Sequence, residues 1–274
     1  MNRIVGIRAH DVGCLPPREL AEAVAAFGLS GVQLSLPKAI RWDGGEVRLT
    51  TQSADEIQAG LAAHGVKISV LSCYINPSIQ DDGLRERELT KFESYLAFAP
   101  RVGAALVGTE TGSFLEDCGD HGWNHGEEAF AICVQSMQRL VRTAASHGVR
   151  VGIEPVVRHV IDSPERLDRL LQAVGREHVR LIFDPVNLLT PQNHAAQRQM
   201  FDTMKHLFGD LVSVIHLKDF VIENGVMVPV RLGTGLMDLP YLASLFPVGD
   251  LVLDEVPIGD VPEIVKTLKE CGLW

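Results

Sequence analysis

The sequence alternates eight times between a short apolar run and a longer amphipathic segment, and few folds accommodate this alternation. Several short runs (ISVL, VSVI, LVL) are continuously apolar, as expected for parallel strands buried on both faces. Strands alternating with helices indicate βαβ units and a parallel sheet. The predicted strands are residues 3–8, 31–36, 67–73, 105–109, 150–154, 179–184, 212–217 and 251–255; the predicted helices are residues 17–27, 54–64, 84–102, 127–147, 164–174, 192–208, 239–246 and 261–271.

Eight β–α units in 274 residues predict an α/β chain folded as a (β/α)8 TIM barrel, one domain over residues 1–274. The alternative is a doubly wound open sheet. That fold favours a glycine-rich turn after the first strand, and GIRAHDVG contains no GxGxxG. Two loops that follow strands, residues 116–126 and 220–231, are long. The second contains Asn224-Gly225, which predicts a hairpin.

Charge and cysteine content restrict the partners. The formal charge of −10 disfavours binding to nucleic acid, and no apolar run approaches the roughly 20 residues needed to cross a bilayer. The five cysteines form no CxxC pair, which predicts reduced thiols and a cytoplasmic location. We therefore expect a small-molecule substrate, with neither nucleic acid nor membrane as partner, and leave a homo-oligomer open.

Four consecutive predicted strands end in GIEP, IFDPVN, VIHLKD and LDEVP. In a barrel, polar side chains at the carboxyl ends of strands carry the chemistry. Glu154, Asp184, His216 and Glu255 hold corresponding places on neighbouring strands, so their side chains can converge. Three carboxylates beside one imidazole need a cation. This oxygen and nitrogen ligand set predicts one divalent metal ion, with Mn²⁺ favoured and Mg²⁺, Co²⁺ or Zn²⁺ as alternatives.

The motifs GIEP, DPVN, HLKD and LGTGLMDLP resemble the xylose-isomerase-like TIM barrel superfamily, also called the sugar phosphate isomerase/epimerase family. The resemblance covers essentially the whole chain. It implies that Glu154, Asp184, His216 and Glu255 bind the metal. It also implies that Glu154 and Glu255 are the catalytic residues, which move protons in the isomerases and epimerases of the family.

The predicted activity is that of a metal-dependent isomerase or epimerase acting on a ketose, a ketose phosphate or a related sugar through a metal-stabilised enediolate. A lyase or dehydratase acting on a keto-sugar or inosose is the alternative, because the same enediolate can expel a β-substituent. A DNA-repair endonuclease is a weaker alternative, since it needs further histidines. The second and third strands instead offer Gln33, Ser35, Cys73 and Tyr74. A non-catalytic sugar-binding barrel is disfavoured by the complete ligand set.

Further polar residues near the predicted strand ends are candidates for substrate binding. Glu110 follows the fourth strand and could bind substrate, act as an auxiliary base or anchor a loop. Asn187 stands where many relatives carry a histidine, which disfavours a second metal. Asp219 is interpreted as structural. The remaining substrate-binding candidates are Lys218, His10 and Arg231.

Overall fold

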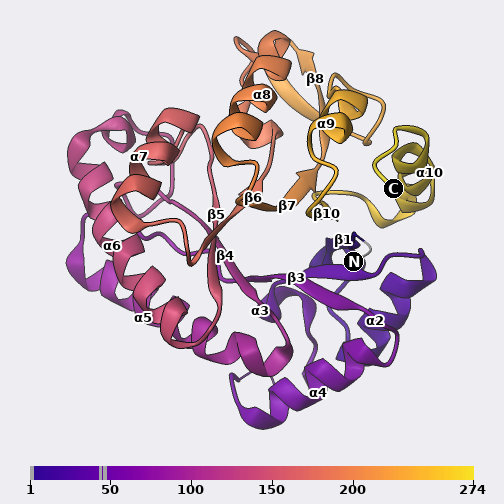
Figure 1. The fold of residues 1–274 in the computed structure, drawn as a ribbon. Coiled ribbons are helices and arrows are strands. Elements are labelled where there is room, and N and C mark those ends of the chain that lie inside the picture. Colours follow the sequence, from indigo (N-terminus) through magenta and orange to yellow (C-terminus); the bar gives the residue numbers. More distant parts are fainter. Residues whose placement is uncertain (1–2, 43–44, 46–47) are drawn as a thin grey trace.

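A closed barrel of parallel strands forms the centre of the molecule (Figure 1), in the computed structural model, which describes residues 3–42, 45 and 48–274. The order around the barrel is β1-β10-β7-β6-β5-β4-β3-β2, so eight strands close it in the predicted βα sequence. These strands are β1 (Val5–Arg8), β2 (Gly31–Leu34), β3 (Lys67–Ser72), β4 (Leu106–Glu110), β5 (Arg150–Glu154), β6 (Val179–Phe183), β7 (Val212–Leu217) and β10 (Asp250–Leu253).

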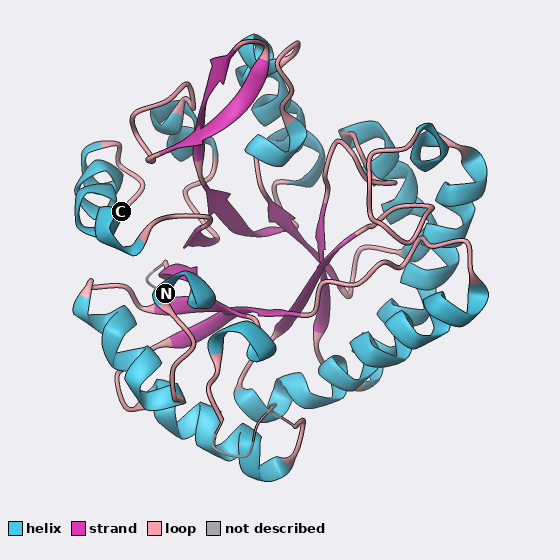
Figure 2. Ribbon diagram, turned by 180° about the vertical axis from the view of Figure 1, so that it is seen from behind, coloured by secondary structure: helices cyan, strands magenta, loops and turns pink. Residues whose placement is uncertain are grey.

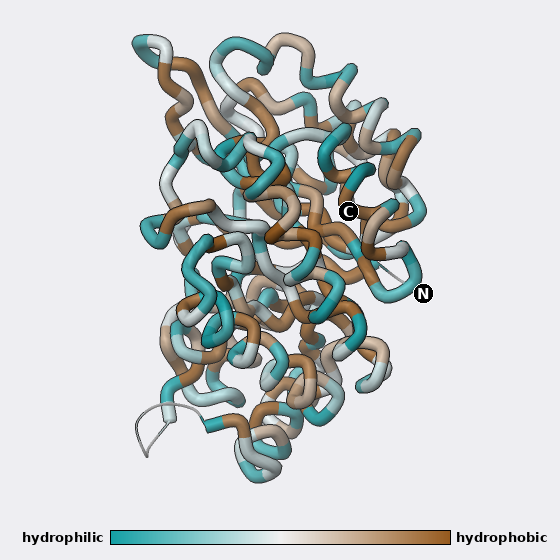
Figure 3. The backbone as a smooth tube through the Cα atoms, turned by 90° about the vertical axis from the view of Figure 1, so that its left-hand side faces the viewer, coloured by the Kyte–Doolittle hydropathy of each residue, from teal (hydrophilic) through white to brown (hydrophobic). Residues whose placement is uncertain are grey.

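Helices surround the strands, as Figure 2 shows from the opposite side. Their apolar faces pack on the outside of the barrel, and Figure 3 shows the hydrophobic stretches gathered toward the interior. No helix in the described part of the chain is both long enough and apolar enough to cross a membrane. The longer helices are α2 (Pro17–Ala26), α4 (Thr51–Ala62), α5 (Asp82–Phe98), α6 (Glu127–Ser146), α7 (Pro164–Val174), α8 (Gln197–Phe208), α9 (Leu239–Leu245) and α10 (Val261–Glu270).

The interior of the barrel is filled by a separate layer of five buried side chains: Val70, Leu106, Ile182, Val214 and Val252. Glycine is required beside this layer. A Cβ added at Gly108 would lie 2.6 Å from Val70 Cγ1 and 2.7 Å from Ile182 Cδ1. The layer divides the interior into an amino end and a carboxyl end.

The predicted fold and most element boundaries are confirmed. Strands β5 and β7 and helix α7 have the predicted ends. The difference that matters most for the strand ends is in the last barrel strand, because β10 ends at Leu253 rather than at residue 255. Helix α4 begins earlier than predicted because Thr50 and Ser53 form a capping box at its start. Helix α8 begins later, after a short 3-10 turn over His194–Ala196.

The predicted hairpin is also confirmed. Strand β8 (Asp219–Glu223) pairs antiparallel with β9 (Val226–Val230), and Asn224 and Gly225 form the turn with φ values of 51° and 77°. Two positive φ angles in succession favour Asn-Gly. The hairpin stands outside the barrel wall (Figure 2). Two four-residue helices that were not predicted, α1 (Ala9–Val12) and α3 (Leu36–Ala39), follow β1 and β2.

Candidate active site

Three metal-ligand side chains meet at the carboxyl end of the barrel. Glu154 is the last residue of β5, Asp184 follows β6 directly, and His216 lies near the end of β7. All three are buried, and one ligand atom from each lies within 4.8 Å of the others. His216 Nδ1 is 3.4 Å from Glu154 Oε1 and 3.7 Å from Asp184 Oδ2. The convergence expected from neighbouring strand ends is therefore present for these three residues.

The group concentrates negative charge away from water. Burial acts to lower the pKa of His216, but the carboxylates of Glu154 and Asp184 outweigh it and raise the pKa well above its usual value. Burial acts to raise the pKa of Asp184, but Lys218 and His216 lower it. Lys218 Nζ lies 2.8 Å from Asp184 Oδ2 and supplies part of the compensating charge. Buried carboxylates are stable only with such positive partners.

The donor set suits a divalent metal ion. His216 Nδ1 is buried and makes no hydrogen bond to any residue that the structure describes, whereas Asp184 Oδ2 is paired with Lys218 Nζ at 2.8 Å. Buried polar atoms are seldom left without such partners. Two carboxylates and an imidazole are ligands that Mn²⁺, Mg²⁺ and Zn²⁺ accept. Glu154, Asp184 and His216 therefore form a group that could hold one metal ion.

A chain of hydrogen bonds orients two of these ligands. Gln33 Oε1 lies 2.6 Å from His216 Nε2, so that nitrogen donates and Nδ1 is left free to face the carboxylates. Gln33 Nε2 donates to the Tyr74 hydroxyl at 3.3 Å, and that hydroxyl donates to Glu154 Oε2. Asn187 Nδ2 donates to Glu154 Oε1 at 2.8 Å, and its backbone N–H donates to Asp184 Oδ1 at 3.1 Å. The site is thus held in place by surrounding polar side chains.

The fourth predicted ligand, Glu255, lies farther out than the other three. Its side chain is 50% exposed, its φ is 56°, and its carboxylate is 3.7 Å from Arg8 and 3.8 Å from Lys218. The preceding Asp254 is 8% exposed instead, and its Oδ2 lies 3.2 Å from Lys218 Nζ and 4.0 Å from His216 Nδ1. Because β10 ends early, Asp254 turns inward and Glu255 stands at the edge of the same cavity.

Glu110 lies beside the three-residue group. It ends β4 and pairs in register with Glu154 on β5. Burial, together with the charge of Glu154, raises the pKa of Glu110 to about 7. His159 Nδ1 is 3.7 Å from Glu110 Oε2, and burial lowers the pKa of His159 to about 4, so this imidazole is neutral at neutral pH. Glu110 can therefore hold a proton near neutral pH, which a general acid requires.

These side chains border a cavity of about 400 Å³ at the carboxyl end of the barrel. Its volume is in the range of pockets for small metabolites. Acidic residues lie at its floor, and basic residues line its walls: Arg8, Lys38, Lys91, Arg158 and Lys218. A smaller, more apolar pocket of about 260 Å³ adjoins it under the β8–β9 hairpin, with Phe220 and Met227 in its lining. The cavity can therefore accept a polar molecule of sugar size.

The family follows from comparison with known proteins. Residues 21–246 match the family model described as xylose isomerase-like TIM barrel. The chain belongs to this family.

Three relatives show how far the similarity extends. An inosose dehydratase from Glaesserella parasuis serovar 5 is 27% identical over 199 residues, which is 66% of this chain and 61% of the relative's length. The structure of a 3-keto-D-glucoside 4-epimerase from E. coli has a TM-score of 0.75 at 15% identity and covers 98% of this chain and 100% of its own. A xylose isomerase-like TIM barrel protein from Mycobacterium smegmatis, in complex with magnesium, has a TM-score of 0.69 at 16% identity. The match covers 99% of this chain and 98% of the other.

In this xylose isomerase-like barrel, the predicted substrate-binding residues fall in different places. Glu110, Asn187, Lys218 and His10 line the cavity, with Asn187 and Lys218 also bonded to the ligand-type residues. Arg231, in contrast, is exposed in the loop after β9 and does not line the cavity.

Three residues near the site of this barrel were not predicted to take part in it: Gln33, Tyr74 and Asp254. Gln33 was recognisable only as a polar residue inside an otherwise apolar strand, GVQL. Tyr74 lies two residues beyond the end of its strand, where the alternation of the strand no longer predicts the direction of a side chain. Their roles depend on contacts between distant parts of the sequence.

Proposed function

We propose that this chain is a divalent-metal-dependent enzyme that moves a proton at the carbon beside the carbonyl of a ketose, a ketose phosphate or a related polyol ketone, as an isomerase or epimerase. The observation that carries the proposal is the buried group of Glu154, Asp184 and His216 at the floor of a sugar-sized cavity. The E. coli structure of the same fold, named as a keto-glucoside epimerase, supports this class of substrate.

We assign the metal to Glu154, Asp184 and His216, with a fourth carboxylate from the Asp254–Glu255 pair. Glu255 is the residue predicted from the motif, and Asp254 lies nearer the other ligands. Mn²⁺ is the expected ion, one per chain. A bound divalent ion would polarise the substrate's ketone oxygen and stabilise the negative charge that develops there.

Proton transfer is assigned to Glu154 and Glu255. Tyr74 and Asn187 each donate a hydrogen bond to the carboxylate of Glu154, which fixes its orientation. Glu255 is half-exposed at the cavity edge, with its carboxylate 3.7 Å from Arg8 and 3.8 Å from Lys218. A carboxylate at the end of β5 and one just beyond β10 can thus approach the substrate from different sides. Epimerisation uses both, and isomerisation can use one.

Substrate recognition is assigned to the walls of the cavity. Glu110, Asn187 and His10 offer hydrogen-bonding groups for hydroxyls, and Lys218 with Arg8 offers positive charge. These basic side chains would also accept a substrate phosphate. The apolar pocket under the β8–β9 hairpin adjoins this cavity and would contact the part of the substrate farthest from the metal.

A dehydratase is the second candidate, and Glu110 favours it. Elimination of water needs an acid that protonates the leaving hydroxyl. The pKa of Glu110 is raised to about 7, so a large fraction of this group carries a proton at neutral pH. The match to an inosose dehydratase supports this candidate.

Proton NMR in deuterated water distinguishes these possibilities. The protein is loaded with Mn²⁺ and incubated with ketoses, ketose phosphates and inososes, and the products are separated from protein and metal before the spectra are recorded. An isomerase or epimerase should place deuterium at one carbon and form an isomer that has lost no atoms other than the exchanged hydrogen. A dehydratase should form a product lighter by one water. If no compound in the panel exchanges a proton or changes, while the protein is folded and holds its metal, the proposal is wrong.

A further inference from the structure

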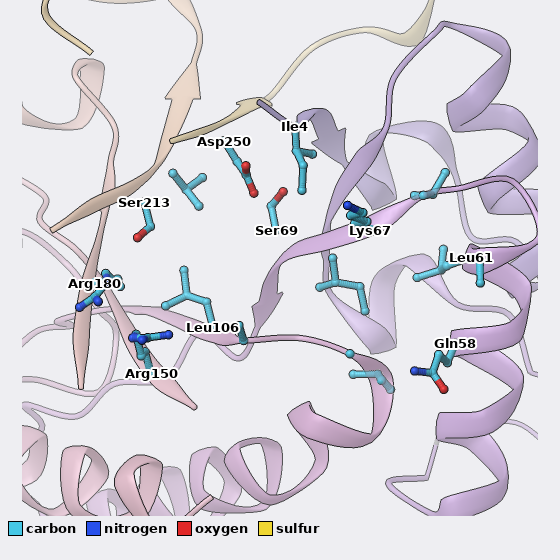
Figure 4. Close-up of a pocket in the computed structure, with 17 residues that line it drawn as sticks. Ile4, Gln58, Leu61, Lys67, Ser69, Leu106, Arg150, Arg180, Ser213 and Asp250 are labelled. Carbon is cyan, nitrogen blue, oxygen red and sulfur yellow. The ribbon is translucent and has the colours of Figure 1, made fainter. Parts of the chain in front are cut away.

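A second cavity, of about 420 Å³, opens at the amino end of the barrel, opposite the candidate active site (Figure 4). Residues at or near the starts of several strands line it, including Lys67 on β3, Arg150 on β5, Arg180 on β6 and Asp250 on β10. The interior layer, through Leu106 and Val214, forms its inner wall. The two cavities are therefore separated by packed apolar side chains.

Positive charge predominates in this amino-end cavity. Its charged lining residues are three cations, Lys67, Arg150 and Arg180, and one acid, Asp250. Burial raises the pKa of Asp250, which disfavours its ionised form. The whole chain carries a formal charge of −10, so a local excess of cations is unusual for this surface. Such a cavity attracts a small anion.

Two of the cations are close together and incompletely paired. Arg150 and Arg180 lie on neighbouring strands, with Gly152 paired in register with Arg180. Burial, and then the charge of Arg150, lower the pKa of Arg180. Carbonyls of Glu177 and Val179 hold one nitrogen of Arg180. Arg150 Nε, in contrast, is buried and has no hydrogen-bond partner in the described part of the chain.

The cavity also offers hydroxyls and an apolar wall. Ser69 and Ser213 contribute hydroxyl groups to the lining, and Figure 4 shows Ser69 beside Asp250 and Ser213 on the side of Arg180. The Ser69 side chain is buried, and its oxygen faces the Asp250 carboxylate (Figure 4). Guanidinium groups and hydroxyls together suit the several oxygens of a phosphate. Ile4 and Leu61 form an apolar part of the lining that could contact the carbon skeleton of a ligand.

We propose that this amino-end cavity binds a small phosphorylated metabolite, with Arg150 and Arg180 contacting its phosphate. Lys67 lies across the cavity from Arg150 and Arg180 (Figure 4) and adds a further positive charge. A volume of about 420 Å³ accommodates a phosphate ester of sugar size. This site is independent of the function proposed for the carboxyl end, because the interior layer lies between them.

Isothermal titration of the metal-free protein with inorganic pyrophosphate tests the site at low ionic strength. We expect one binding site per chain that persists in Arg8→Gln, the variant that removes a charge from the carboxyl-end cavity. Arg150→Gln and Arg180→Gln should each raise the Kd about tenfold or more, since each removes a charged hydrogen-bond donor. Lys67→Gln should raise it less. Lys67 is exposed at the start of its strand, so this variant keeps the test decisive if an arginine variant does not fold.

Two controls separate this site from other basic surfaces. Arg87→Gln removes an exposed charge on α5 and should leave the Kd unchanged. Arg8→Gln removes charge at the carboxyl-end cavity, which can also accept a phosphate, and should leave the Kd of the amino-end site unchanged. The proposal is overturned if pyrophosphate does not bind, if only Arg8→Gln weakens binding, or if succinate binds more tightly than pyrophosphate.

Discussion

Replacing Asp219 by Asn tests how strongly one buried carboxylate organises the loop between β9 and α9. Asp219 begins β8, directly after the HLK segment that carries His216 and Lys218. Its Oδ1 accepts hydrogen bonds from the backbone N–H groups of Phe220 at 2.8 Å and Met237 at 3.0 Å. Its Oδ2 accepts from two further backbone N–H groups, of Gly233 and Gly235, both at 2.9 Å. One side chain thus fixes four backbone donors.

The expected loss of stability follows from these contacts. Asn keeps one carbonyl oxygen and replaces the other with an amide that donates rather than accepts. The carbonyl oxygen of Asn can keep accepting the hydrogen bonds from the buried backbone N–H groups of Phe220 and Met237. The N–H groups of Gly233 and Gly235 then lose their acceptor, each at a cost of about 1–3 kcal/mol. Both glycines are partly accessible to water, which can replace part of the lost hydrogen bonding. We therefore expect a total loss of stability of about 2–4 kcal/mol.

Urea denaturation followed by circular dichroism measures this change. A loss of 2–4 kcal/mol corresponds to a fall in Tm of about 4–8 °C for a chain of this length. Asp55→Asn, an exposed position on α4, is the matched control and should change stability by less than about 0.5 kcal/mol. Amide exchange should accelerate at Gly233 and Gly235 before other sites. A variant as stable as the control, with unchanged exchange at these glycines, would refute the reasoning.

The metal-free protein should bind one Mn²⁺ per chain in a titration, and two or three tightly held ions would contradict a mononuclear site. Asp254→Asn and Glu255→Gln, compared by the same titration, identify the fourth ligand as the variant that loses more affinity. Glu154→Gln should reduce turnover by about a hundredfold or more; full activity with metal retained would exclude it from proton transfer. Glu110→Gln should stop elimination in a dehydratase but retain deuterium exchange, both followed by NMR. Gly108→Ala should destabilise the barrel by about 1–3 kcal/mol in urea, because its Cβ overlaps Val70 and Ile182.

The fold was predictable because local patterns and the global architecture agree. Apolar runs without alternation identified the barrel strands, and Asn224-Gly225 identified the hairpin outside them. The end of β10 was not predictable. LVLDEVP reads as a continuing strand, but contacts from distant residues end it. Arg8 pairs with Asp254 at 3.2 Å, and the Asp11 carboxylate accepts the N–H of Val256.

The candidate site was predictable where adjacent strands alone determine it. Glu154, Asp184 and His216 follow strands that are consecutive in both sequence and space. Gln33 and Tyr74 come from the other half of the chain and reach His216 and Glu154 only when the barrel closes. A register shift between Val32 and Gln33, where β2 pairs with β3, alters the strand locally at this position. No local pattern in GVQL predicts this register shift.

The hydrogen-bond chain from His216 through Gln33 and Tyr74 to Glu154 has a consequence for the order of assembly. Its two ends belong to the part of the polypeptide synthesised later, and its two middle members to the part synthesised first. Before closure, the imidazole can carry its hydrogen on either nitrogen, and the glutamate can rotate. An ion offered to the open chain therefore meets a weaker site than one offered to the closed barrel. Capture of the proposed metal would then be a late event, available only to chains that have joined their first and last strands.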